Sequence, residues 1–112
     1  MPIRLEEYEH ACVLGIDGDL AGENAAELRR IAQEQIESRQ VADFIVDFEK
    51  CPFIDSEGLE TLLWLKRRCE DVFGQLKLAC LDDNCRKILE ITRLDCRFEI
   101  HQEIAAALKM MR

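Results

Sequence analysis

Ser56 is the residue of this chain best placed for chemistry, in the string Ile54-Asp55-Ser56-Glu57-Gly58. Apolar side chains recur at helical spacing after it, so a helix is expected to begin at Asp55 or Ser56 and run to about residue 71; they are Leu59, Leu62, Leu63 and Cys69. The first turn of a helix has unpaired backbone N–H groups and the positive end of the helix dipole. A serine at that place either caps the helix or accepts a phosphoryl group.

The structural explanation of Ser56 is a simple helix cap, supplied by Asp55 or by Ser56 itself. Neither choice gives a capping box, because the third residue of the helix would be Gly58 or Leu59 instead of Glu or Gln. If Asp55 caps the helix, the backbone does not need the Ser56 hydroxyl, which can then face solvent. Gly58 costs a helix about 1 kcal/mol relative to alanine. That cost indicates that something approaches the backbone closely there.

A serine or cysteine hydrolase is the remaining catalytic alternative. The G-x-S-x-G nucleophile elbow is absent around Ser56, and the two histidines that could act as a base, His10 and His101, are distant from it in sequence. We expect His10 in a solvated turn and His101 at a helix start. No glycine-rich phosphate-binding motif is present. The sequence therefore favours a protein that is not an enzyme and has no cofactor.

Six cysteines invite a disulfide or zinc interpretation; they are Cys12, Cys51, Cys69, Cys80, Cys85 and Cys96. Most of them fall where an apolar residue would fall, in the middle of a strand or on the inner face of a helix. Free cysteine behaves as a small buried apolar residue. The tight C-x-x-C pairs of zinc sites are absent, so we expect free thiols and no metal site.

Composition narrows the class of partner. The chain has 112 residues and a net charge of −8, which predicts one domain and argues against binding nucleic acid or anionic membranes. The first residues show no signal-peptide pattern, and no apolar run approaches the length of a membrane span. We therefore expect a cytoplasmic protein without membrane insertion. The sequence leaves the oligomeric state open.

The apolar pattern predicts an α/β domain in the order β-β-α-β-α-β-α-β-α. Strands are expected at 3–8, 11–16, 44–48, 76–81 and 98–100, and helices at 24–38, 55–71, 84–92 and 102–110. Asn24 is the expected N-cap of the first helix, and Thr92 and Ala105 are expected to point inward. The first two strands should form an antiparallel hairpin, and single-helix crossovers make the others parallel. The result is a mixed, mostly parallel sheet of about five strands with about four helices, as one domain over 1–112.

The segment from Phe44 to Leu59, FIVDFEKCPFIDSEGL, resembles the signature of STAS domains, the anti-sigma factor antagonist family. In that signature an apolar strand ends in Asp, and Asp-Ser-x-Gly-Leu follows at a helix start. The string Gly18-Asp19-Leu20 is similar to the family's Gly-x-Leu before its first helix. The closing strand and helix, 100–108, also match, so the resemblance covers nearly the whole chain.

The resemblance implies a phosphorylation switch at Ser56. In bacterial members, a partner kinase that is itself an anti-sigma factor phosphorylates the matching serine. The unphosphorylated form binds that kinase and frees the sigma factor, and a serine phosphatase resets the switch. The implied partner-binding surface consists of Asp19, Ala21, Asn24, Asp55, Ser56, Glu57, Gly58 and Trp64.

Three residues depart from the family pattern or add to it. Glu57 stands where many members have a small residue, and Ala21 replaces the polar residue usual after Gly-x-Leu. Trp64 either packs under a neighbouring helix or anchors an interface, since aromatic residues are enriched at binding hot spots. STAS domains also serve as nonphosphorylated scaffolds, in transporters and in large signalling assemblies, and this is the alternative function.

Overall fold

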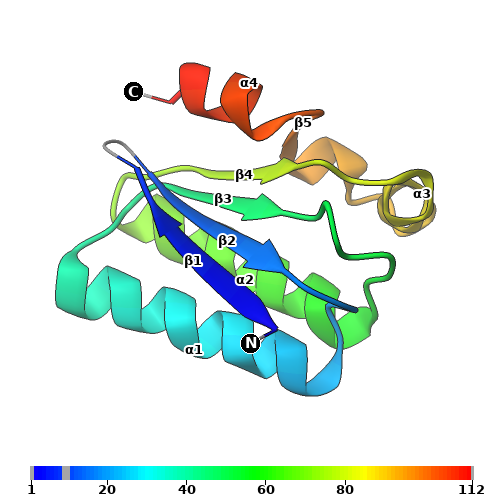
Figure 1. Cartoon of the computed structure of the whole chain (residues 1–112), viewed down its shortest axis with the longest axis horizontal. Coiled ribbons are helices and arrows are strands. Elements are labelled where there is room, and N and C mark those ends of the chain that lie inside the picture. The colour runs from blue at the N-terminus through cyan, green and yellow to red at the C-terminus, as the bar shows by residue number, and fades with distance from the viewer. Residues whose placement is uncertain (1, 9–10, 112) are drawn as a thin grey trace.

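A five-stranded sheet forms the centre of the computed structural model, which describes residues 2–8 and 11–111. Figure 1 shows the strands and helices of the chain. They are β1 (Ile3–Glu7), β2 (Cys12–Ile16), α1 (Gly22–Arg39), β3 (Phe44–Asp47), α2 (Ser56–Asp71), β4 (Leu76–Ala79), α3 (Asp83–Ile91), a 3-10 turn (Asp95–Arg97), β5 (Glu99–His101) and α4 (Ile104–Lys109). The predicted order and fold class are confirmed.

The strands lie in the order β1-β2-β3-β4-β5, so neighbours in sequence are neighbours in the sheet. β1 pairs antiparallel with β2, and the other three pairings are parallel. Leu14, Val46 and Leu78 stand side by side on three adjacent strands. This register places the ends of β2 and β3, and the loops that follow them, at one end of the sheet. The predicted turn at Glu9 and His10 lies outside the described residues.

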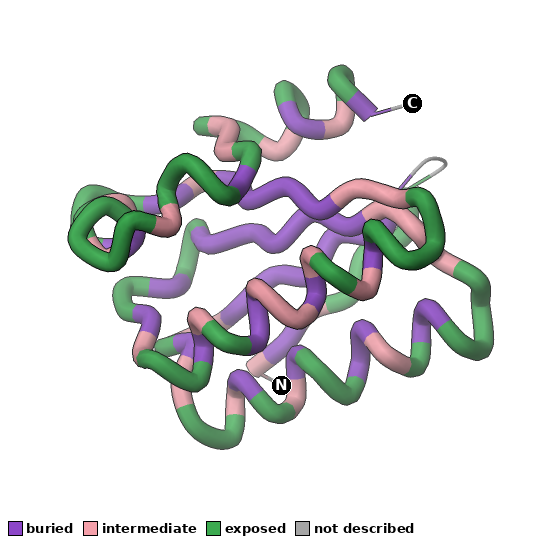
Figure 2. Tube along the Cα trace, turned by 180° about the vertical axis from the view of Figure 1, so that it is seen from behind, coloured by how far each residue is buried: buried purple, intermediate pink, exposed green. Residues whose placement is uncertain are grey.

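Helices cover the two faces of the sheet unequally. α1 and α2 lie together on one face, whereas the short α4 lies on the other, and α3 sits at one end of the sheet (Figure 1). Figure 2 shows the central strands buried along their length and the outer surfaces of the helices exposed. The larger core includes Leu28, Phe44 and Leu62, and the smaller one beneath α4 includes Val13 and Ala107.

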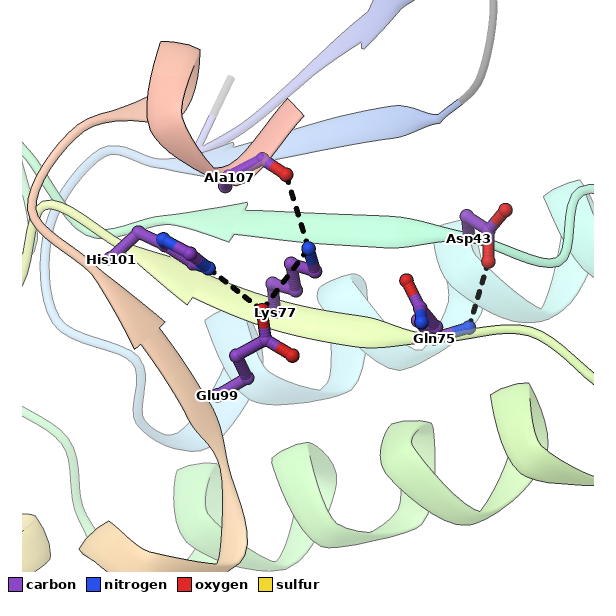
Figure 3. A network of polar contacts seen from close by, with 6 residues as sticks. All are labelled: Asp43, Gln75, Lys77, Glu99, His101 and Ala107. Carbon is purple, nitrogen blue, oxygen red and sulfur yellow. Dashed lines mark hydrogen bonds and ion pairs between the residues drawn. The ribbon is translucent and has the colours of Figure 1, made fainter. Parts of the chain in front are cut away.

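A buried lysine joins α4 to the sheet. Lys77 on β4 is 1% exposed, and its Nζ lies 3.1 Å from Glu99 Oε2 and donates to the Ala107 carbonyl oxygen at 3.3 Å (Figure 3). His101 Nε2 lies 2.8 Å from the same Glu99 oxygen. The hydrogen bond with His101 is the main cause that lowers the pKa of Glu99, with Lys77 adding to it. The network links β4, β5 and α4.

Several local predictions were wrong. α1 begins at Gly22 after the extended residue Ala21, so Asn24 lies in its first turn and is not the N-cap. Thr92 is the exposed C-cap of α3, and its hydroxyl donates to the Ile88 carbonyl at 2.8 Å instead of pointing inward. Ala105 is also exposed, and Ala107 takes the buried position in α4. His101 ends β5 and does not begin a helix.

Candidate functional site

Asp55 is the N-cap of α2, and Ser56 is the first residue of the helix. Asp55 Oδ1 accepts a hydrogen bond from the Gly58 N–H at 2.8 Å, and the Asp55 backbone is extended. Ser56 and Glu57 are exposed. The carboxylate therefore performs the capping, and the Ser56 hydroxyl makes no hydrogen bond with any residue that the structure describes.

Gly58 is required by a contact inside the chain. A Cβ at this position would lie 2.2 Å from the Leu20 carbonyl oxygen and 2.9 Å from Ile54 Cγ2. Real Cβ atoms essentially never approach backbone oxygens that closely, so the first turn of α2 can pack here only without a side chain. The close approach predicted from the glycine is therefore made by Leu20, in the loop before α1, and needs no partner protein.

Two loops are hydrogen-bonded to each other beside Ser56. Leu20 N–H donates to the Phe53 carbonyl at 2.9 Å, and Asp55 N–H donates to the Leu20 carbonyl at 3.2 Å. Gly18 N–H donates to the Lys50 carbonyl at 3.0 Å. These bonds hold the segment after β2 against the segment after β3. They place the segment that contains the predicted site residues Asp19, Ala21 and Asn24 next to the start of α2.

The predicted residues of the first loop differ in exposure. Asp19 is exposed, whereas Ala21 and Asn24 are half-buried. Asn24 Nδ2 donates to the Asp19 carbonyl at 2.8 Å. The role of Asn24 is thus to fix the loop that carries Asp19, and its side-chain nitrogen is already engaged within the chain.

Three residues that the sequence did not single out for the site hold the loop before Ser56. Asn84 Nδ2 donates to the Pro52 carbonyl at 2.8 Å. The Cys85 thiol donates to the Cys51 carbonyl at 3.2 Å, and the Cys51 thiol donates to the Phe53 carbonyl at 3.3 Å. The only sequence signal was their position, with Cys51 before a proline and Asn84 and Cys85 at a helix start. No local pattern predicts that α3 supports the loop after β3.

The start of α2 combines donors and acidic groups. Within the described chain, the N–H groups of Ser56 and Glu57 have no acceptor, as is usual for the first turn of a helix. They lie at the positive end of a 16-residue helix. The carboxylates of Asp55 and Glu57 flank the hydroxyl in sequence. An anion on Ser56 would therefore gain from the helix and be opposed by two acidic neighbours.

Trp64 lies away from the serine, on the same helix. It follows Ser56 by eight residues, which corresponds to about 12 Å along an α-helix. Its half-buried side chain packs against the larger core, and the Arg29 guanidinium carbon lies 4.5 Å from the centroid of its ring. Trp64 therefore contacts α1, and its role as an interface anchor stays a prediction.

Among the residues that the structure describes, no hydrogen bond joins the Ser56 hydroxyl to a histidine or a thiol. His101 is engaged with Glu99 on β5, and His10 lies outside the described residues. The pKa of the Cys85 thiol is raised, mainly by its hydrogen bond with the Cys51 thiol and then by burial. Burial likewise raises the pKa values of Cys12 and Cys69 to about 12. In the described residues no three His, Cys, Asp or Glu side chains are grouped to hold a metal ion.

The family model for the STAS domain matches residues 2–107. The chain belongs to the STAS domain family. The predicted family is thereby confirmed. No helix within 2–8 and 11–111 is long and apolar enough to cross a membrane.

Solved structures agree with this fold. A Thermotoga maritima protein described as an anti-sigma factor antagonist is 17% identical with a TM-score of 0.90, over 98% of this chain and 94% of the other. The Bacillus anti-sigma factor antagonist SpoIIAA in its phosphorylated form is 23% identical with a TM-score of 0.78, over 98% and 99% of the two chains. The murine anion transporter Slc26a9 is 18% identical with a TM-score of 0.75, over 93% of this chain and 18% of the transporter.

Proposed function

We propose that this STAS domain is an anti-sigma factor antagonist-like binding protein, switched by phosphorylation of Ser56. The observation that carries the proposal is the division of roles at the start of α2. Asp55 makes the capping bond, and the exposed Ser56 hydroxyl is free of any bond to a described residue. A kinase can reach such a hydroxyl without unfolding the helix.

The added charge would change the surface more than the fold. A phosphoserine carries about −1.5 to −2 charges near neutral pH, and the N-terminus of a helix stabilises an anion. SpoIIAA keeps a structure similar to this chain in both forms, with TM-scores of 0.80 for the unphosphorylated and 0.78 for the phosphorylated protein. We therefore expect phosphorylation to act on a docked partner by charge repulsion and steric exclusion.

The partners in this proposal are an anti-sigma factor that is also a serine kinase, and a serine phosphatase, acting in the cytoplasm. The binding surface is the exposed end of α2 with the adjoining loop, centred on Ser56, Glu57 and Asp19. Phe53 is 43% exposed and lies in the loop before the serine, so it adds an apolar contact to this otherwise polar surface. STAS domains are generally regulatory modules, and the proposed role involves no catalysis by this chain.

The test uses the two serines of the chain as a matched pair. Ser56→Ala should bind the anti-sigma kinase as tightly as the unphosphorylated protein, and Ser56→Asp should bind at least about tenfold more weakly, because a charge at an interface without a counter-charge is costly. Ser38 is exposed near the end of α1, and Ser38→Asp adds the same charge away from the site. Isothermal titration calorimetry measures all three. Equal affinity of Ser56→Ala and Ser56→Asp would contradict the switch.

The second candidate function is a nonphosphorylated STAS module of a transporter or signalling assembly. Glu57 favours it, because this carboxylate stands directly beside the serine and is exposed where a kinase would bind. The similarity to Slc26a9 shows that the fold also occurs within an anion transporter. Glu57→Ala separates the two candidates: phosphorylation that becomes efficient only in this variant would support the nonphosphorylated module.

A further inference from the structure

A second surface with unusual chemistry lies between α1 and α2. It is an open groove with a volume of about 480 Å³, lined by Ala26, Arg29, Arg30, Gln33, Trp64 and Arg68. We call it the arginine groove. It contains three arginines and the single tryptophan of a chain whose net charge is −8. The groove is therefore a basic site on a protein that is acidic overall.

Contacts inside the chain hold the arginines in place but leave two of them without a counter-charge. Arg30 is neutralised by Glu27, with Nη2 to Oε2 at 2.8 Å. Arg29 lies over the Trp64 ring, and Arg68 Nε donates to Gln33 Oε1 at 3.2 Å. Neither Arg29 nor Arg68 forms an ion pair with a carboxylate in the part of the chain that the structure describes. These two guanidinium groups therefore remain available to an external anion.

We propose that the arginine groove binds an acidic peptide segment of a partner protein. A guanidinium group recognises a carboxylate through paired hydrogen bonds, and Arg29 and Arg68 offer two such groups on facing helices. The half-buried Trp64 ring adds a rigid apolar surface of the kind that is common at binding hot spots. The partner segment therefore carries carboxylates beside at least one apolar side chain.

The charge distribution disfavours larger polyanions. Nucleic acids and anionic membranes need a broad basic surface, because their charges extend well beyond one groove. Here Glu27 neutralises one arginine, and Glu34 lies close enough to Arg30 to raise its pKa. The chain as a whole carries a net charge of −8, so a long polyanion would meet repulsion outside the groove. A short acidic segment fits this pattern, and its binding does not depend on the proposed phosphorylation of Ser56.

The test is a peptide-binding measurement with the whole chain. A fluorescein-labelled peptide of glutamate and leucine residues is titrated with the protein, and anisotropy reports binding. The same titration with unlabelled peptide follows the fluorescence of Trp64, the only tryptophan. The control peptide has glutamine in place of every glutamate. We expect saturable binding of the acidic peptide, a change in Trp64 emission, and no binding of the control.

Variants assign the binding to the groove. Arg29→Gln with Arg68→Gln should weaken binding by about tenfold or more, since hydrogen bonds to charged groups contribute strongly. Arg67→Gln on the exposed surface of α2 is the matched control, and it should leave the affinity unchanged. Circular dichroism verifies that each variant is folded. Absence of binding, equal binding of the glutamine peptide, or equal weakening by Arg67→Gln would overturn the proposal.

Self-association is a separate outcome, because the acidic segment could belong to a second copy of this chain. Sedimentation of the unliganded protein tests this directly. We expect the arginine variants to sediment like the original protein. A dimer that dissociates on Arg29→Gln and Arg68→Gln would overturn the assignment to another protein.

Discussion

Helices α2 and α3 begin with the same hydrogen bond and then differ at the next three positions. Asp55 Oδ1 accepts from Gly58 N–H at 2.8 Å, and Asp82 Oδ1 accepts from Cys85 N–H at the same distance. Both caps have an extended backbone. The first helical residue is Ser56 in α2 and Asp83 in α3. One helix therefore starts with a hydroxyl side chain and the other with a carboxyl side chain.

The third helical residue differs as well. Gly58 has no room for a Cβ against Leu20, whereas the Cys85 side chain is buried and donates to Cys51. α3 uses its first turn to support the neighbouring loop from within. α2 packs its backbone directly on a loop and leaves its first side chains in solvent. The same capping bond therefore accompanies a supporting side chain in α3 and an accessible hydroxyl in α2.

The two helix starts should differ most in the free energy of unfolding that is lost when their third helical residue is replaced. Gly58→Ala should lower the free energy of unfolding by about 3 kcal/mol, because its Cβ must displace the Leu20 backbone. Cys85→Ala should cost about 1 to 2 kcal/mol through a lost buried contact and hydrogen bond. Urea denaturation measures both. Glu60→Ala on the exposed surface of α2 is the control and should change the free energy of unfolding only slightly. An equally small change for Gly58→Ala would show that Leu20 leaves room for a side chain.

The two caps should contribute alike. Asp55→Ala and Asp82→Ala should each lower the free energy of unfolding by about 1 kcal/mol, because each removes one side-chain acceptor from a first turn. Thermal and urea denaturation of the two variants measure the pair side by side. A much larger loss of stability in Asp55→Ala would mean that this carboxylate has a role beyond capping. The two caps would then not be equivalent.

The smallest effects should come from the first helical residue. Ser56→Ala should change the free energy of unfolding by less than about 0.5 kcal/mol, since its hydroxyl bonds to no described residue. Ser56→Asp should raise the free energy of unfolding by about 0.3 to 1 kcal/mol at low salt, because it places a negative charge at the positive end of the helix dipole. The gain should shrink as salt is added. Destabilisation by Ser56→Asp would show that Asp55 and Glu57 outweigh the helix.

The sequence predicted the elements that depend on local pattern. Alternating apolar segments indicated the order of strands and helices along the chain, and the Asp-Ser-x-Gly-Leu string indicated both the family and the start of α2. The prediction that Asn24 caps α1 was wrong, because the turn at Gly22 starts the helix earlier and Asn24 bonds back to Asp19.

Contacts between distant segments could not be predicted. Gly58 meets Leu20, Asn84 holds Pro52, and Arg29 covers Trp64, and each pair joins two elements whose approach depends on the completed fold. The burial of individual residues in α4 was also beyond local pattern. Ala105 and Ala107 are equally small and apolar, and only the packing of α4 on the sheet decides which is buried.

Phosphate incorporation at Ser56 decides whether this serine is a phosphorylation switch. The protein is incubated with ATP and each anti-sigma serine kinase of the organism that carries this chain, and intact mass followed by peptide mapping locates the modification. Ser56→Ala and Ser38→Ala are the matched variants. We expect one phosphoryl group on Ser56, lost in Ser56→Ala and retained in Ser38→Ala. Incorporation at another residue, or none with any kinase that binds the protein, would contradict this role of Ser56.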